Sequence, residues 1–531
     1  MIRSLLAALS LIVLALAPAL AAQGVTADRL IGPGDDIAAA FAQAEAGETL
    51  VVQGHHRVTE ALPLRDDQTV FLDGATIDGS VLLDPAGWTR SGQTWRQAIP
   101  DAEGSGHCDC KRPQNYIDKK KNPLAGEREK LLVDGTFIFE VAKGRGTPDG
   151  SAKWWRHEDG AAVINFDPKG HVIEVTHAEQ IFAGKADNVR ILGASPERAV
   201  IRGAASPLHR GMIEGRGTVG WTVDGVTVED SASVGLRLKC GLIRNAVIRE
   251  NGQIGVTGSG GRCRWPEGAA HGKWFNSVVD SEIYRNNLAL FREEWAAGGV
   301  KLGLRIKACR VAGNRVWGNL GTALWVDNRG GGSCVFEDNL IWANARSGLH
   351  AEYQAKQPGF DYAFLARNNI VVNNSPKKGW KVNRAAAMVR RQPDAAFIGN
   401  VFVQAGGGNF LGIKQNEASA RSDDWVSRNT VFRDNVVVFL RDSVGVGGLL
   451  IQKVEGALED LNAAIDGNLY VMPKGQEDRP RWWLETASGG GDRGWSGWQS
   501  AGYDRNGSRL SVDDPVAWLR QHHPKAAALL N

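Results

Sequence analysis

The sequence predicts an all-β protein, most of it a right-handed parallel β-helix, which is a solenoid of stacked coils. Short β-branched stretches recur from about residue 190 to 455, and each is followed by Asn or Gly. Two of these stretches, residues 313–319 and 338–344, match position for position at an offset of 25. Repeats of this size, with no helical periodicity between them, are typical of stacked β-coils.

Asparagine recurs at one corner of the predicted coils. Asparagine tolerates a left-handed backbone conformation, and its side-chain amide can both donate and accept hydrogen bonds along the axis of a stack. We therefore expect a ladder formed by Asn314, Asn339, Asn369, Asn400 and Asn435.

The first 22 residues predict a signal peptide. Arg3 precedes an apolar run over residues 5–20, and small residues follow it up to Ala22. This order is that of a cleavable secretory signal. We therefore expect a periplasmic or extracellular protein. No later segment approaches 18 consecutive apolar residues, so we expect no membrane span after signal cleavage.

The remaining chain divides into four predicted parts. Residues 23–84 form an N-terminal cap and the first coils, because Asp35 to Gly47 contains one capped amphipathic helix bearing Ile37 and Phe41. Residues 85–190 lose the period but keep strand–turn–strand signals, which favours an inserted small β-domain. The parallel β-helix occupies 191–455. Residues 456–531 are a Trp/Gly-rich tail and cap ending in a short helix near 514–519.

Charge and cysteine content exclude some classes of protein. A net charge of +3 is too small to predict nucleic-acid binding. The cysteines at 108, 110, 240, 263, 309 and 334 are too few for a disulfide scaffold. Cys309 and Cys334 fall at inward positions of adjacent coils, so we expect buried free thiols there, with an inter-coil disulfide as the alternative.

Alternation along one strand of each coil predicts which side chains face outward. Leu324 and Val326 are the inward pair of one strand, so Trp325 and Asp327 face outward, and His350, Glu352 and Lys301 follow by the same argument. Two outward columns are predicted. One contains Lys239, Thr257, Lys301, Asp327, Glu352, Asn383 and Lys414, and the other contains Arg237, Trp325, His350 and Lys381.

Asp327 and Glu352 are predicted neighbours on adjacent coils, about 4.8 Å apart in the backbone. Two carboxyl groups ~5 to 5.5 Å apart suit a retaining glycosidase. Lys301 beside Asp327 would keep that group ionised as the nucleophile, while Glu352 acts as acid/base. Trp325 is then available to stack on a sugar, and His350 to bond a hydroxyl. A solvated charge ladder that prevents edge aggregation is the alternative interpretation.

The segments 295–301 (WAAGGVK), 324–327 (LWVD) and 350–352 (HAE) resemble a pattern in right-handed β-helix glycoside hydrolases. That group includes β-xylosidases and α-L-fucosidases. The resemblance implies a nucleophile at Asp327 and an acid/base at Glu352, with no cofactor. Residues 498–504 also resemble a tail found in bacterial β-helix carbohydrate proteins.

Basic residues flank this line at Arg237, Lys239, Lys301, Lys381 and Lys414, which suits uronate sugars. The sequence is also similar to β-helix polysaccharide lyases, in which Lys301 or His350 would be the base and Asp327 and Glu352 would hold Ca²⁺. A glycan-binding surface protein without catalysis is a third alternative. In each case we expect an oligo- or polysaccharide partner and a monomer.

Overall fold

The structure is a computed structural model, and it describes residues 26–100, 115–142, 144–215, 217–259, 276–303, 305–374, 385–404, 409–414, 426–440, 449–452, 462–478, 482–486 and 489–530. The predicted signal peptide lies outside these residues. Within the described ranges, no helix is both long enough and apolar enough to cross a membrane.

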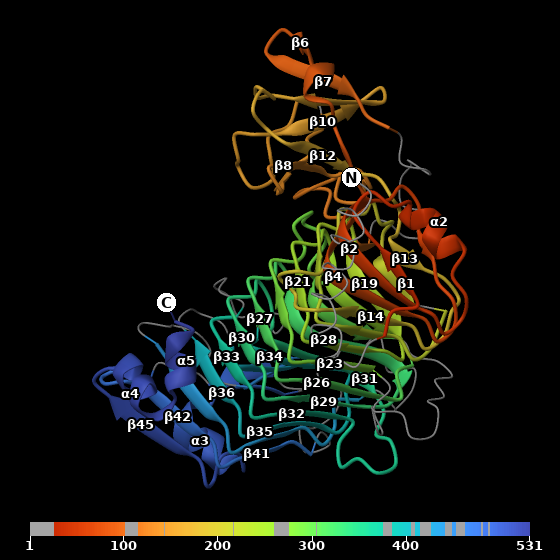
Figure 1. Ribbon diagram of the computed structural model, residues 1–531. Coiled ribbons are helices and arrows are strands. Elements are labelled where there is room, and N and C mark those ends of the chain that lie inside the picture. The colour runs from red at the N-terminus through yellow and green to blue at the C-terminus, as the bar shows by residue number, and fades with distance from the viewer. Residues whose placement is uncertain are drawn as a thin grey trace.

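Each coil of the solenoid contributes three short strands (Figure 1). One coil consists of β25 (Gly298–Gly303), β26 (Ala308–Ala312) and β27 (Arg315–Trp317), and the next of β28 (Thr322–Gly331), β29 (Ser333–Glu337) and β30 (Leu340–Trp342). Each strand pairs in parallel with its equivalent in the next coil. The predicted parallel β-helix is therefore confirmed.

The strands stack in three rows along the molecule. The first row is an eleven-stranded sheet that contains β25 and β28. Its other strands are β3 (Leu62–Pro63), β13 (Phe182–Ala183), β16 (Gly211–Gly215), β19 (Val234–Lys239), β22 (Ile254–Ser259), β31 (Leu349–Gln354), β34 (Ala387–Arg390), β37 (Leu411–Lys414) and β40 (Leu449–Gln452).

The second and third rows join into one 24-stranded sheet through the long strands β2 (Thr49–Arg57) and β4 (Thr69–Asp78). The second row adds β1 (Arg29–Ile31), β14 (Arg190–Gly193), β17 (Thr222–Asp224), β20 (Leu242–Arg244), β23 (Asn276–Val279), β32 (Phe364–Arg367), β35 (Ala395–Ile398), β38 (Val431–Arg433) and β41 (Ala464–Asp466). The third adds β15 (Val200–Arg202), β18 (Thr227–Glu229), β21 (Val247–Arg249), β24 (Glu282–Tyr284), β33 (Ile370–Val372), β36 (Val401–Gln404), β39 (Val436–Phe439), β42 (Leu469–Pro473) and β45 (Ser508–Val512). The solenoid thus continues beyond residue 455 into the predicted tail.

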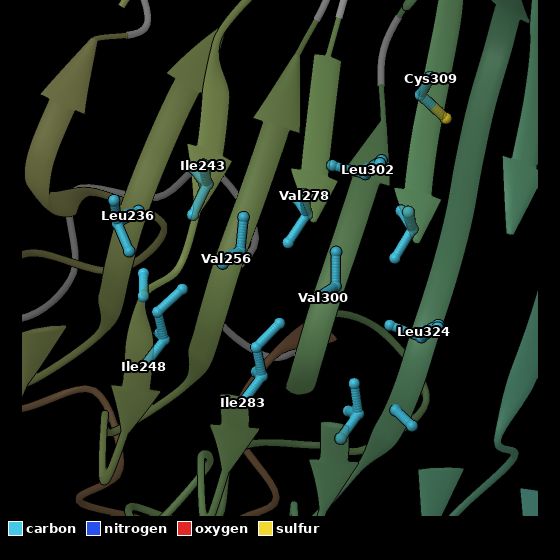
Figure 2. Packing of buried hydrophobic residues seen from close by; sticks show 14 of the residues in the cluster. Leu236, Ile243, Ile248, Val256, Val278, Ile283, Val300, Leu302, Cys309 and Leu324 are labelled. Carbon is cyan, nitrogen blue, oxygen red and sulfur yellow. The ribbon is translucent and has the colours of Figure 1, made fainter. Parts of the chain in front are cut away.

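A single apolar core runs through the coils. Leu236, Val256, Val300 and Leu324 occupy one register position on successive strands of the first row (Figure 2). All four are at most 1% exposed. Because inward positions repeat from coil to coil, like side chains stack on like and leave the alternate positions to face outward.

The predicted asparagine ladder is present. Side-chain amides connect Asn314, Asn339, Asn369, Asn400 and Asn435, with Nδ2 to Oδ1 distances of 2.8 to 3.0 Å. A second, unexpected ladder contains Asn251, Asn286, Asn319, Asn344 and Asn374. The left-handed backbone falls on the preceding residue, for example Asp338 with φ 56°. The expectation that the ladder asparagines themselves adopt it was wrong.

Helices lie at both ends of the solenoid (Figure 1). At the N-terminal end, α2 (Ile37–Ala42) begins after Asp36, whose side chain accepts from the Ala39 N–H. Its Phe41 ring lies 6.1 Å from that of Phe182, so the helix covers the first coils as predicted. At the other end lie α3 (Gly494–Ser500), α4 (Pro515–His522) and α5 (Pro524–Ala528), and α4 begins near the predicted residue.

Two antiparallel sheets interrupt the solenoid between β4 and β13, and Figure 1 shows them above its N-terminal end. One contains β6 (Thr89–Ser91), β7 (Thr94–Ala98), β10 (Trp155–Glu158) and β11 (Ala161–Ile164), and the other contains β5 (Ser80–Leu82), β8 (Leu131–Val133), β9 (Thr136–Ile138) and β12 (Ile173–Thr176). A short 3-10 helix, η1 (Pro85–Gly87), precedes β6, and a last hairpin pairs β43 (Trp483–Thr486) with β44 (Gly489–Asp492). The two sheets share a separate core that includes Trp88, Trp155 and Ile164. We call residues 80–176 the insert.

The cysteine prediction was wrong for one pair. Cys309 and Cys334 face each other in register on β26 and β29 and form a disulfide inside the core. Inward positions on adjacent coils bring the two Cα atoms to 4.5 Å, which is within disulfide reach. Cys240 is also disulfide-bonded, while Cys108, Cys110 and Cys263 lie outside the described residues.

Candidate active site

The predicted site lies on the outer face of four neighbouring first-row strands, β25, β28, β31 and β34. Leu324 and Val326 of β28 are buried in the core, so the intervening Trp325 points outward. Leu349 and Ala351 of β31 are also buried there. His350 and Glu352 therefore share the outer face with Trp325 and Asp327.

Strand register places the two carboxyl groups side by side. Asp327 pairs with Glu352, and Trp325 pairs with His350. Neighbouring strands are about 4.8 Å apart, so the expected adjacency of Asp327 and Glu352 is observed. We name the two outward lines of residues for what they carry. The carboxylate column contains Lys239, Ser259, Gly303, Asp327, Glu352 and Arg390, and the aromatic column contains Arg237, Thr257, Lys301, Trp325, His350 and Met388.

Lys301 and Thr257 were expected in the carboxylate column, but both lie one outward position away, in the aromatic column. Lys301 pairs with Trp325, while the partner of Asp327 in β25 is Gly303. The flexible lysine stem nevertheless reaches across, and its Nζ lies 2.9 Å from Asp327 Oδ2. The same ammonium lies 3.6 Å from the centre of the Trp325 ring and donates to the Trp295 carbonyl.

The residues expected to follow His350 and Glu352 in the next coil were also wrong. Arg390 and Met388 of β34 pair with Glu352 and His350, where Asn383 and Lys381 were expected. Residues 375–384 lie outside the described ranges. Residues 380–383 alternate apolar with basic or polar side chains, whereas the apolar Met388 breaks this alternation in residues 387–390, so alternation favoured the wrong segment.

A segment between β24 and β25 covers this part of the sheet. Arg346 donates to the Glu293 carbonyl over 2.7 Å, and Gln253 donates to the Ala296 carbonyl over 2.8 Å. We call residues 289–297 the covering segment. It explains why the outward-facing Trp325 and His350 are each only 2% exposed. This cover comes from a non-repeating loop, so the coil period gave no signal of it.

Residues 115–125, within the insert sequence, hold the covering segment in place. Lys121 Nζ lies 2.5 Å from Glu293 Oε1, and Asn122 donates to the Ala289 carbonyl over 2.9 Å. Ala125 and Phe291 share a small apolar cluster. The insert therefore contributes indirectly to the wall of the site.

Trp325 does not offer a ring face to a ligand. Lys301, from the strand before, lies over the ring, and His350, from the strand after, stacks on it at 4.6 Å with 14° between the planes. The expectation that Trp325 stacks on a sugar therefore does not fit this geometry. Its Nε1 is buried and has no hydrogen-bond partner among the described residues.

Glu352 and Asp327 lie in different environments. The pKa of Glu352 is raised to about 7, mainly by burial and also by the neighbouring charge of Asp327, although Arg390, Lys301 and Arg391 oppose both effects. The Glu352 side chain is 4% exposed, whereas that of Asp327 is 31% exposed and paired with Lys301. Glu352 is thus suited to hold a proton near neutrality, whereas Asp327 forms an ion pair with Lys301.

His350 is a neutral side chain in the resting site. Burial lowers its pKa well below the usual range, and the charges of Arg346, Arg390 and Lys301 lower it further. Its Nε2 lies 3.7 Å from Glu352 Oε2. Both ring nitrogens are buried and lack a hydrogen-bond partner in the described part of the chain.

The remaining predicted basic residues lie further along the columns. Arg237 donates to the His209 carbonyl and lies 3.9 Å from Glu214, so it belongs to a group two strands before Lys301. Burial, aided by Lys301 and Arg237, lowers the pKa of His209 to about 3. Lys239 is in the carboxylate column three strands before Asp327, and the backbone of Lys414 follows Arg390.

The site does not fit the Ca²⁺ expected for a lyase. Calcium takes six to eight oxygen ligands, but here a lysine contacts Asp327 and an arginine lies 3.4 Å from Glu352 Oε1. Among the described residues, no group of three or more His, Cys, Asp or Glu side chains is arranged to hold a metal ion.

Comparison with known proteins supports the fold. A family model described as a right-handed beta helix region matches residues 212–402. The chain matches no curated protein significantly. A solved structure described as the complex of XylC with xylose has a TM-score of 0.57 and 15% identity, covering 83% of both chains. Two other solved structures are more distant. A glycoside hydrolase has a TM-score of 0.44 and 10% identity, covering 84% of this chain and 96% of that one. The pectate lyase Pel9A has a TM-score of 0.33 and 13% identity, covering 84% of this chain and 80% of that one.

These observations define the class of the protein. It is an all-β protein of the right-handed parallel β-helix fold, with a carboxyl pair on the outer face of its first sheet.

Proposed function

We propose that this protein is an exported glycoside hydrolase that retains the configuration of the anomeric carbon. The observation that carries the proposal is the pair Asp327 and Glu352. They are register neighbours on adjacent strands, one ion-paired with Lys301 and the other buried with its pKa raised to about 7. A one-strand offset suits the ~5 to 5.5 Å separation of retaining enzymes better than the ~6.5 to 9.5 Å of inverting ones.

The proposed reaction has two steps. In the first, the Glu352 carboxylic acid protonates the glycosidic oxygen while Asp327 attacks the anomeric carbon. The carbon–oxygen bond breaks, and the leaving alcohol departs with the proton. In the second step, the Glu352 carboxylate takes a proton from water, whose oxygen displaces Asp327 from the anomeric carbon and regenerates both groups.

Neighbouring side chains support these roles. The Lys301 ammonium is 2.9 Å from Asp327 Oδ2, so an opposite charge favours the anion needed for attack. The free nitrogens of His350 and Trp325 Nε1 are suited to hold sugar hydroxyls. XylC shares this fold and is described in complex with xylose, which agrees with a sugar ligand.

The proposal is tested by replacing each carboxyl group. Asp327→Ala should abolish turnover, because no covalent intermediate can form. Glu352→Gln should lose 10²- to 10⁴-fold, mostly on substrates with poor leaving groups, which depend on protonation. Rates on activated aryl glycosides and on oligosaccharides, with the anomer of the first product followed by NMR, separate these roles.

The control is Asp513→Ala, which removes an exposed carboxylate from the C-terminal end of the solenoid and should leave rates unchanged. Full activity in both site variants would remove Asp327 and Glu352 from the mechanism. An inverted first product would instead mean that Asp327 activates water.

A polysaccharide lyase is the second candidate, because His350 is neutral, buried and unpartnered. In that reaction, His350 would remove the proton α to a uronate carboxyl group. The β-eliminated product then carries a double bond and absorbs in the near ultraviolet. Its appearance would favour the lyase, and a saturated reducing sugar would favour the hydrolase.

A further inference from the structure

Positive charge gathers around Glu352 beyond what the two carboxyl groups balance. Lys301, Arg346, Arg390 and Arg391 all act on Glu352 or on His350. Lys301 is matched by Asp327. Of the other three cations, Arg346 is also offset by Glu293 and Glu294, whereas Arg390 lies against Glu352.

The three arginines differ in their other contacts. Arg346 donates to the backbone carbonyl of Glu293, whose carboxylate is already paired with Lys121. Arg391 donates to the hydroxyl of Tyr353. Arg390 Nη1 lies 3.4 Å from Glu352 Oε1, while its buried Nε has no hydrogen-bond partner in the described ranges.

Catalysis makes this imbalance larger. The proposed hydrolysis begins with Glu352 protonated, and in that state the carboxyl group carries no charge to offset Arg390. His350 adds no negative charge, since a neutral imidazole is its only alternative to a cation. A neutral sugar that excludes water would therefore leave the Arg390 guanidinium, whose side chain is 29% exposed in the empty site, without a counter-charge beside it, which is unfavourable.

We propose that the sugar bound at this site is acidic, a glycuronic acid residue whose carboxylate pairs with the guanidinium of Arg390. This inference rests on the proposed function and narrows its substrate class. Arginine is suited to the task, because its planar fork presents two parallel N–H groups to a carboxylate. Arg391 and Arg346 add to the positive field at the same place.

Binding provides a test that does not require turnover. Glu352→Gln has the charge of the protonated acid and leaves Arg390 free of its carboxylate. Calorimetry on this variant should show that di- or trisaccharides ending in a glucuronic or galacturonic acid bind about 10- to 100-fold more tightly than the matching hexosides, as for a charge-assisted hydrogen bond. Adding Arg390→Gln to Glu352→Gln should reduce this ratio to near one.

Matched controls isolate the arginine. Arg433→Gln removes an exposed guanidinium from the second row and, in the Glu352→Gln background, should keep the ratio. Circular dichroism of the double variant confirms that it is folded, and Arg390→Lys should retain part of the ratio if charge is what matters. Equal affinity for uronides and hexosides, or a ratio unaffected by Arg390→Gln, would overturn the inference.

Turnover separates this inference from the proposed function. Hydrolysis of aryl hexosides and pentosides with no preference for the uronides would overturn the acidic substrate and leave the hydrolase intact. Tight uronide binding with an unsaturated product would keep the acidic substrate and replace hydrolysis by elimination.

Discussion

Glu352 is the residue whose surroundings most constrain the chemistry. It faces away from the core on β31 but is 3% exposed, because the covering segment lies over this part of the sheet. Burial favours its neutral form, whereas three cations favour its charged form. The balance between them sets the pH at which a proton can be delivered.

The first prediction concerns pH. Glu352 must be protonated to act as the acid, so kcat/KM should fall as pH rises through about 7. Arg390→Gln removes a charge that lowers the pKa of Glu352, so the alkaline limb should move to higher pH. Profiles of kcat/KM against pH, measured on one hexoside, check both the fall above about pH 7 and its move in Arg390→Gln, with Arg433→Gln as the control. A limb that does not move in Arg390→Gln would mean that another group titrates.

Alternation in the sequence identified the outward residues, but not their environment. It placed Trp325, Asp327, His350 and Glu352 on one face, which the buried residues between them confirm. It did not reveal Arg346, which lies in the corner before β31, or the stacking that encloses Trp325. Arg346 lies in a loop, and loop lengths differ between coils and carry no periodic signal. The enclosure of Trp325 depends instead on the strand register, which pairs it with Lys301 and His350.

At the scale of the coil, the two asparagine ladders hold each turn to the next. Asn339 donates to Val311 O over 2.9 Å and to Asn369 Oδ1 over 2.8 Å, and its own Oδ1 accepts from Asn314. The side chain is fully buried, so every one of these groups depends on its neighbours.

The second prediction follows from this dependence. Asn339→Ala leaves several buried donors and acceptors without partners, each worth about 1 to 3 kcal/mol. The free energy of unfolding should therefore fall by about 3 kcal/mol or more. Denaturant unfolding followed by circular dichroism measures it. Asn368→Gly is the matched control, because Asn368 is the exposed left-handed neighbour of the ladder residue Asn369. It should change stability by less than about 0.5 kcal/mol.

The first asparagine ladder could be predicted because the spacing of its asparagines is visible in the sequence. The strand register could be predicted only in part. The match of residues 313–319 with 338–344 fixed the third row correctly. In the first row, the connections vary in length, and Lys301 was displaced by one outward position. Register is set by packing of the inward residues, and a shift by two residues preserves the inward and outward pattern.

At the scale of the whole molecule, a buried group of charges joins the insert to the solenoid. Glu174 of the insert lies 2.5 Å from Arg57 and 2.9 Å from Arg202, and both arginines also contact Asp78. Arg57 and Arg202 hold the pKa of Glu174 below its usual value although burial acts in the opposite direction. Because residues 115–125 hold the covering segment, this junction also bears on the site.

The third prediction tests that connection. Glu174→Gln leaves two arginines short of a buried counter-charge, which costs about 3 to 5 kcal/mol. Hydrogen exchange should rise in β8 and β12 while the first row stays protected, and KM should increase because the covering segment loses support. Glu179→Gln, which alters an exposed pair with Arg128, should cost less than about 1 kcal/mol. Unchanged exchange in β8 and β12 would show that the junction does not hold the insert.

The paired strands that carry Asp327 and Glu352 have a consequence for how such a protein can diverge. Their spacing is the pitch of the solenoid, which the ladders at the corners of each coil maintain. Lengthening a loop, or exchanging the insert, leaves that pitch untouched and alters only what surrounds the carboxyl pair. Under the proposed function, changes in the loops or the insert can therefore alter which glycan fits while the catalytic pair keeps its spacing, whereas Arg390 is fixed to that spacing because it lies on β34 beside Glu352.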